Sequence, residues 1–198
     1  MTDQKRPYRM KRRAEQEEET RLRITESAVE LHGTVGPAHT SISAVAERAG
    51  VRRSTVYRHF PDEAALFGAC SAHWIAQNPP PEAGAWAAIE DPEERLATAL
   101  DELYAYYRRT EEMLDKLLRD AATVPIIGEM MGAFRTFLEG SGEALMKGRK
   151  ARGSARRRQR AAIGHALAFT TWQDLSGAQG LDDRRAAELI CRFVAAAA

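Results

Sequence analysis

The stretch TSISAVAERAGVRRSTVYRHFPDEAALF, residues 40–67, decides how the N-terminal part of the chain folds. Its apolar spacing predicts two short helices, of which the first ends at Gly50 and the second ends before Pro61. Glycine adopts the positive φ that lets a second helix cross the first. A tight turn at Gly50 therefore makes this pair of helices a helix-turn-helix.

The second of these helices carries residues with the chemistry of duplex recognition. Its outward side combines short hydroxyls with arginines, which suit base edges and phosphates in a major groove. These outward residues are Arg53, Ser54, Thr55 and Arg58. On spacing alone, an ordinary helical hairpin with solvated arginines is the alternative, since such pairs of helices also occur away from DNA.

With these residues the sequence resembles the TetR family of bacterial transcriptional repressors. The resemblance runs through Thr40, residues 45–51, residues 55–60 and Leu66-Phe67, and a first helix around Ile24 and Ala28 fits the same family. It implies a homodimer that places two recognition helices in successive major grooves of a palindromic operator. It also implies a C-terminal domain that binds a small effector and releases the repressor from DNA.

Carried over residue by residue, the resemblance implies a set of DNA-binding residues on the two short helices, in contact with bases or phosphates. The set is Thr40, Ser41, Arg52, Arg53, Ser54, Thr55, Tyr57, Arg58 and His59. Two residues depart from the family pattern. Arg52 stands where a serine often caps the recognition helix, and Glu63 stands where a phosphate-binding lysine is common.

The whole chain has 198 residues, of which 44% are hydrophobic, so it is long and apolar enough for a buried core. Helical periodicity runs through nearly its whole length without strand alternation, and we expect an all-α protein. Prolines at 79–81 are the one clear break in composition. We expect a basic N-terminal arm at 1–14, a helix-turn-helix DNA-binding domain at 15–68, and a helical ligand-binding and dimerisation domain at 69–198.

Charge is unevenly distributed, although 29 basic and 28 acidic residues give a net charge of only +1. Residues 1–13 are basic, with Asp3 as their one acid. This arm could enter a minor groove, lie along phosphates, or be a solvated tail. Residues 147–160 carry lysines and arginines and no acid, which favours an exposed loop over a second DNA or nucleotide contact.

The second half of the chain contains aromatic and methionine side chains at helical spacing. Asp91-Pro92 predicts a helix start, and Thr110 predicts the cap of a further helix. Stripes of this kind are usually plain core, but the resemblance favours an effector pocket among them. The candidate ligand-binding residues are Trp74, Tyr104, Tyr107, Met130, Phe134, Phe137 and Trp172.

The last two apolar stripes of the chain predict a homodimer interface. Each is narrow, as packing in a four-helix bundle with a symmetry mate requires, although some of each must also face its own domain. The resemblance supports the choice of these stripes. The candidate interface residues are Ile163, Leu167, Thr171, Leu175, Leu189, Ile190 and Phe193.

Several function classes lack support in the sequence. No phosphate-binding glycine loop, metalloprotease motif or nucleophile elbow is present, so we expect no enzyme and no cofactor. Cys70 and His73 lie one helical turn apart, but no further ligand accompanies them, and we expect no metal site. Few cysteines and the lack of a long apolar run favour a cytoplasmic protein.

A ligand-responsive transcriptional repressor is the function that these patterns favour. Its partners would be double-stranded operator DNA, a second copy of the chain and a small apolar or aromatic effector, with no membrane. Two other readings stay open. One is a helical protein-interaction module, and the other is a DNA-binding dimer without a small-molecule ligand.

Overall fold

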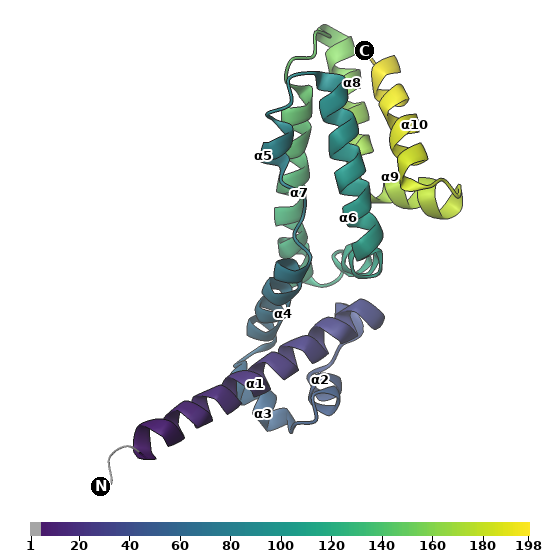
Figure 1. The fold of residues 1–198 in the computed structure, drawn as a ribbon. Helices are drawn as coiled ribbons and strands as arrows, with labels where there is room; N and C mark the ends of the chain where they lie inside the picture. Colours follow the sequence, from purple (N-terminus) through teal and green to yellow (C-terminus); the bar gives the residue numbers. More distant parts are fainter. Residues whose placement is uncertain (1–4) are drawn as a thin grey trace. The chain divides into compact units, whose positions relative to one another are not determined.

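The structure, a computed structural model, describes residues 5–198, so residues 1–4 of the predicted arm lie outside the described residues. The N-terminal helices are α1 (Lys5–Thr34), η1 (Pro37–His39), α2 (Ile42–Arg48), α3 (Arg53–His59) and α4 (Glu63–Gln77). They are followed by α5 (Ala83–Trp86), α6 (Pro92–Asp120), α7 (Pro125–Met146), α8 (Gly153–Ala166), α9 (Phe169–Gln173), η2 (Asp174–Ala178) and α10 (Asp183–Ala196). No strand occurs over residues 5–198, and the predicted all-α class is confirmed (Figure 1).

The chain divides into two compact units. Unit 1 contains the chain up to Pro79 together with Asp115–Ile126, and unit 2 contains Pro80–Leu114 and Ile127–Ala198. Helix α6 is a single helix that contributes to both units. Its residues 92–114 belong to unit 2, and its residues 115–120 belong to unit 1.

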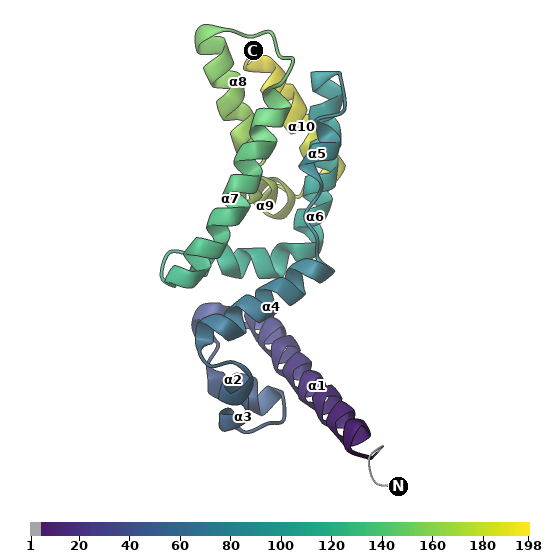
Figure 2. The ribbon, with the colours of Figure 1, turned by 90° about the vertical axis from the view of Figure 1, so that its left-hand side faces the viewer.

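Unit 1 is built around α1, which packs against both α2 and α4 (Figures 1 and 2). Its core side chains are almost fully buried, among them Ile24, Ala28, Val45, Val56 and Phe60. Helix α4 starts at an aspartate cap, because the Asp62 carboxylate accepts a hydrogen bond from the Ala65 amide at 2.7 Å.

Helix α1 begins at Lys5, so residues 5–14 of the predicted basic arm are helical and continuous with the predicted helix-turn-helix domain. Apolar periodicity is absent from this early part, so the pattern alone misses it. Exposed pairs spaced four residues apart support it instead. Lys11 Nζ lies 3.9 Å from a Glu15 carboxylate oxygen, and Arg13 Nε lies 3.2 Å from one of Glu17.

Unit 2 is a bundle in which α6, α7, α8 and α10 run side by side (Figure 2). Its core includes Leu96, Leu100, Leu103 and Tyr107 from α6, all fully buried. The predicted cap at Thr110 is wrong, because α6 continues through this residue. The buried Thr110 hydroxyl donates to the Tyr106 carbonyl at 2.6 Å, which leaves it no role at a helix start.

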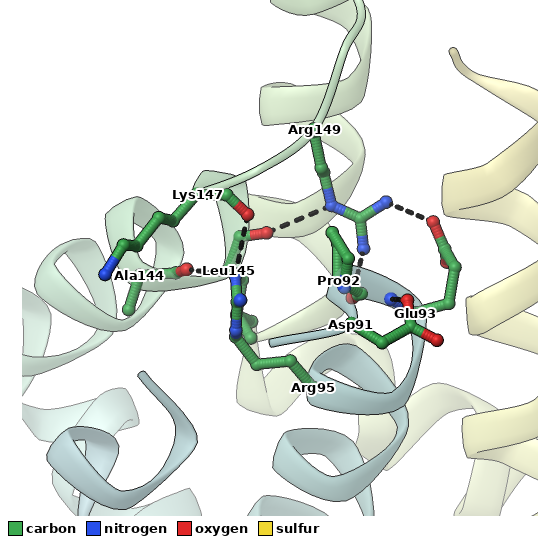
Figure 3. A network of polar contacts seen from close by, with 8 residues as sticks. All are labelled: Asp91, Pro92, Glu93, Arg95, Ala144, Leu145, Lys147 and Arg149. Atoms are coloured by element: carbon green, nitrogen blue, oxygen red, sulfur yellow. Dashed lines mark hydrogen bonds and ion pairs between the residues drawn. The ribbon is translucent and has the colours of Figure 1, made fainter. Parts of the chain in front are cut away.

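Two buried arginines join the start of α6 to the end of α7 (Figure 3). Arg95 donates to the backbone carbonyls of Ala144 and Lys147 at 3.1 and 2.7 Å, and also to those of Ile89 and Glu90. Carbonyls at a helix C-terminus have no partner within the helix, so a guanidinium can satisfy them.

Arg149 is the second of these arginines, and it corrects the prediction of an exposed loop at 147–160. Its guanidinium donates to Glu93 Oε1 at 2.6 Å and to the Pro92 carbonyl at 2.9 Å (Figure 3). The segment is also not all loop, because α8 begins at Gly153. The charge pattern could not reveal that one cation of the run turns inward to an acid far away in the sequence.

None of the helices within residues 5–198 combines the length and the hydropathy needed to cross a bilayer.

Candidate nucleic-acid interface

Helices α2 and α3 pack against each other on either side of a turn at Gly50. Ser41 caps α2, with its side-chain oxygen accepting from the Ala44 amide at 3.1 Å. Gly50 has a φ of 65°, and the next amide, that of Val51, donates back to the Ala46 carbonyl at 2.9 Å. An L side chain rarely adopts this φ, which explains the glycine at the turn.

Helix α3 buries one side and exposes the other. Val56 is fully buried, whereas Arg52, Arg53, Ser54, Tyr57 and Arg58 are exposed. The helix cap at Arg52 has no side-chain hydrogen bond, as expected from the departure at this position. The exposed side is therefore basic and rich in hydrogen-bond donors.

Arg53 and Tyr57 interact with each other on this exposed side. Arg53 Nη2 donates to the Tyr57 hydroxyl at 3.2 Å, and the guanidinium carbon lies 5.5 Å from the ring centroid. The contact is between two solvent-exposed groups, so it contributes little stability and is easily exchanged for other hydrogen bonds. Both side chains are already oriented away from the core of unit 1.

The C-terminal end of α3 is held by Arg21, a residue that the sequence pattern did not single out. Arg21 Nη1 donates to the His59 carbonyl at 3.1 Å, and its guanidinium lies 4.5 Å from the ring centroid of buried Phe60. Its place one turn before Ile24 on the apolar side of α1 was a usable signal. A cation at the last carbonyls of a helix also suits the helix dipole.

The other predicted DNA-binding residues are less free than those of α3. The Thr40 hydroxyl donates to the Gly36 carbonyl at 2.8 Å, and Thr55 is half-buried. His59 Nε2 is buried and has no hydrogen-bond partner among the described residues. Burial, with a smaller contribution from Arg58, lowers the pKa of His59. The nine predicted residues all lie in unit 1, on α2, α3 or the residues next to them.

The last turn of α6 contacts the loop before α2, a contact that the sequence did not predict. Asp120 Oδ2 accepts from the Ala38 amide at 2.9 Å, and Arg119 Nη2 donates to the Val35 carbonyl at 3.2 Å. Gly36 has a φ of 93°, and a Cβ atom there would overlap the Arg119 guanidinium. The Arg119 hydrogen bond lowers the pKa of Asp120.

A buried histidine lies between α1 and α4. His32 Nδ1 is 3.5 Å from Cys70 Sγ, and the His32 ring contacts Phe67 with centroids 5.6 Å apart. Burial lowers the pKa of His32 to about 4 and outweighs the carboxylate of Asp120, which acts in the opposite direction. Burial also raises the pKa of Cys70 to about 11. Cys70 thus pairs with His32, while His73 Nε2 lies 2.9 Å from Gln77 Nε2.

The predicted ligand-binding residues are divided between the two units. Trp74 belongs to unit 1, and the others belong to unit 2. Tyr104 and Tyr107 are fully buried, and their hydroxyls donate to the carbonyls of Ala166 and Leu167. Trp172 Nε1 donates to Asp183 at 2.9 Å.

An aromatic group does assemble in unit 2 around Tyr107. Phe134 and Phe137 stack with ring centroids 6.0 Å apart, and Phe134 also contacts Tyr107 edge-on at 6.5 Å. These two phenylalanines, like Met130, are only half-buried. Helix α7 therefore carries the accessible part of the aromatic group.

The predicted interface residues fall on two different sides of their helices. Four of them are buried in the core of their own unit, namely Ile163, Leu167, Thr171 and Ile190. Leu175 is half-buried, whereas Leu189 and Phe193 are 46% and 49% exposed. The sequence stripes marked the side of α8 that faces its own core. The apolar surface that remains outside consists of Leu189 and Phe193, with His165 in ring contact with Phe193 at 6.2 Å.

Comparisons with known proteins agree with this geometry. A family profile described as bacterial regulatory proteins, tetR family, matches residues 24–70. Comparison with curated protein sequences finds no match.

Several solved structures share the fold over most of their length. A TetR-like transcriptional regulator from Rhodococcus sp. is 20% identical, with a TM-score of 0.64 over 88% of this chain and 93% of that one. A tetR-family transcriptional regulator from Streptomyces coelicolor is 17% identical, with a TM-score of 0.62 over 91% and 80%. NalD, the secondary repressor of the MexAB-OprM multidrug efflux pump in Pseudomonas aeruginosa, is 22% identical, with a TM-score of 0.60 over 92% and 97%.

The matched residues 24–70 include the buried part of α1, the α2–α3 pair and the first half of α4, which are the elements that position the exposed side of α3. Residues 24–70 thus match the profile of bacterial regulatory proteins, tetR family, and the chain has the fold of TetR-like transcriptional regulators.

Proposed function

We propose that the protein is a transcriptional repressor that binds palindromic operator DNA as a homodimer through α3. The observation that carries this proposal is the two-sidedness of α3. Val56 is fully buried, whereas Arg53, Ser54 and Tyr57 face solvent. A B-DNA major groove is wide enough for one helix, and arginine and tyrosine supply donors for base edges and phosphates.

A dimer follows from the small size of the recognition element. Helix α3 has only 7 residues, so one copy reads few base pairs. Two copies held about 34–36 Å apart read successive grooves of a palindrome. The exposed Leu189 and Phe193 on α10, beside His165 on α8, support a contact between two copies here.

We assign control of DNA binding to a small apolar or aromatic effector in unit 2. The half-buried Phe134, Phe137 and Met130 of α7 are the side chains that such a molecule would meet beside the core. Helix α6 has residues in both units and ends in the contacts to Val35 and Ala38. An effector acts only if it binds the DNA-competent and the released conformation with different affinity.

A DNA-binding dimer without an effector is the second candidate, and one observation favours it. The polar atoms of Tyr104, Tyr107 and Trp172 are all hydrogen-bonded within the protein. A ligand would have to displace these bonds or rely on apolar contacts alone. A thermal-shift screen of aromatic and apolar compounds separates the candidates, because a ligand that binds the native state raises its melting temperature.

The DNA-binding function is tested by selection of duplexes from a random library with the purified protein. We expect a palindromic sequence to be enriched and bound at least a thousandfold more tightly than random duplex. Arg53→Ala should weaken this complex by about 1–3 kcal/mol, whereas Arg184→Ala, an exposed change on α10, should not. Equal binding to selected and random duplex would refute the repressor and favour a protein-interaction module.

A further inference from the structure

The N-terminal part of α1 projects beyond the packed part of unit 1. Every residue from Tyr8 to Glu19 is exposed, and in both ribbon views α1 runs on past α3 (Figures 1 and 2). We refer to residues 8–13 as the α1 extension. Nothing in the core of unit 1 requires it, since the first fully buried residue of the helix is Ile24.

The α1 extension carries a concentration of positive charge, most of it on one side of the helix. It contains Arg9, Lys11, Arg12 and Arg13 and no acid. Successive helical residues are about 100° apart, so Arg9, Arg12 and Arg13 share one side of the helix and Lys11 points to the opposite side. Arg9 and Arg12 have no acidic partner among the described residues, and Arg12 lies 6.0 Å from the Tyr8 ring centroid.

The two other cations are only weakly neutralised. Lys11 and Arg13 pair with Glu15 and Glu17, but all four side chains are more than half exposed. Exposed pairs of this kind contribute little and are readily exchanged. Cations in the first turns of a helix also interact unfavourably with its dipole. The free protein therefore carries positive charge at Arg9 and Arg12 that no acid among the described residues neutralises, next to two cations that are only weakly paired.

The direction of the α1 extension is fixed relative to α3. Arg21 binds the His59 carbonyl and lies over Phe60, which ties α1 to the end of α3 within unit 1. From Arg21 to Arg9 the helix rises by about 18 Å at 1.5 Å per residue. That length is about five base pairs of B-DNA, for which ten base pairs measure about 34 Å.

We propose that the α1 extension binds the phosphate backbone of the same duplex, on the flank of the half-site that α3 reads. This proposal rests on the DNA-binding function proposed for α3. A helix is about 10–12 Å across, whereas a minor groove is about 6 Å wide. The extension therefore lies along phosphates as a helix and does not enter the minor groove as an extended arm.

The acids that follow set the limit of this contact. Glu15, Glu17, Glu18 and Glu19 occupy the next turn and a half of α1 and repel phosphates. The binding surface thus ends at Arg13. Because phosphate contacts are independent of sequence, the extension contributes affinity and salt dependence without choosing the operator.

The test uses the full-length protein and an operator recovered by selection from random duplexes. One duplex ends at the outer edges of the half-sites, and a second continues for about six base pairs on each side. Arg9→Ala/Arg12→Ala is compared with Arg135→Ala/Arg184→Ala, which removes equal charge from exposed positions on α7 and α10. Affinity is measured by fluorescence anisotropy between 50 and 200 mM salt.

On the long duplex, the Arg9→Ala/Arg12→Ala dimer should lose up to four phosphate contacts. The slope of log K against log salt should then fall by up to about 3.6, at about 0.9 per contact. On the short duplex the slope of Arg9→Ala/Arg12→Ala should equal that of the wild type. The slope of the control variant Arg135→Ala/Arg184→Ala should equal that of the wild type on both duplexes. An unchanged slope on the long duplex overturns the contact proposed for the extension while leaving the function of α3 intact. Failure of the wild type to select any duplex overturns both.

A second variant separates helical placement from charge. Met10→Pro keeps every cation but breaks the helix near the middle of the extension, and Met10→Ala is its matched control. Loss of helix is checked by circular dichroism. Met10→Pro should weaken binding to the long duplex at least fivefold at 100 mM salt. Binding equal to that of Met10→Ala would show that a flexible arm suffices, and would overturn the helical contact.

Discussion

Replacement of His32 should remove a large part of the acid sensitivity of unit 1. Burial lowers its pKa to about 4, against about 6.5 in an unfolded chain. Because burial disfavours the charged ring, protonation of His32 favours the unfolded chain. The free energy of unfolding is therefore highest above pH 6.5, where the ring is neutral in both states, and decreases as the pH falls towards 4. A gap of about 2.5 pKa units corresponds to about 3.4 kcal/mol in total, of which about 2 kcal/mol is lost by pH 5.

The assay is native-state hydrogen exchange by mass spectrometry, followed in peptides from α1 and α4 and corrected for the intrinsic pH dependence of exchange. It reports on unit 1 without assuming that both units unfold together. Between pH 7.5 and 5 the wild type should lose about 2 kcal/mol more protection than His32→Gln. His73→Gln, on the half-exposed side of α4, is the matched control and should behave like the wild type. Equal losses in the wild type and His32→Gln would refute the reasoning.

Three further changes test other parts of the structure. Arg95→Met keeps the aliphatic stem but leaves four backbone carbonyls without their donor. Urea denaturation should show unit 2 destabilised by about 3 kcal/mol. Arg95→Lys should have a stability between those of the wild type and Arg95→Met. Gly36→Ala should cost about 1–3 kcal/mol at its positive φ and increase hydrogen exchange at the Ala38 amide. Phe193→Glu puts a charge on the exposed apolar side of α10. The variant should sediment as a monomer and should not bind the operator tightly. A variant that stays dimeric would place the dimer interface elsewhere.

The helix-turn-helix could be predicted closely because its determinants are local. The turn at Gly50 needs a positive φ, and the end of α3 precedes Pro61, so both signals lie within a few residues of their effect. The lack of a side-chain cap at Arg52 could likewise be read from the residue type. Helix α1 differed because its early turns depend on charge pairs and intrinsic propensity, which leave no apolar stripe.

In unit 2 the helical class could be predicted, but neither the ends of the helices nor the direction of their faces could. A stripe such as Ile163 and Leu167 packs equally well against its own core or against a second copy, and periodicity does not distinguish the two. The structure buries both residues, and Leu189 and Phe193 remain outside. Thr110 shows the same limit for polar residues. A threonine caps a helix or donates to the carbonyl four residues earlier, depending on whether the chain continues.

The contacts that complete unit 1 come from residues far apart in the sequence. Ala38 and Asp120 are separated by 82 residues, and each is unremarkable in its own segment. A hydrogen bond between a backbone amide and a carboxylate leaves no compositional trace, so only the folded chain reveals it. Its consequence is that unit 1 is discontinuous in sequence: the loop before α2 is hydrogen-bonded to the end of a helix whose first turns belong to unit 2.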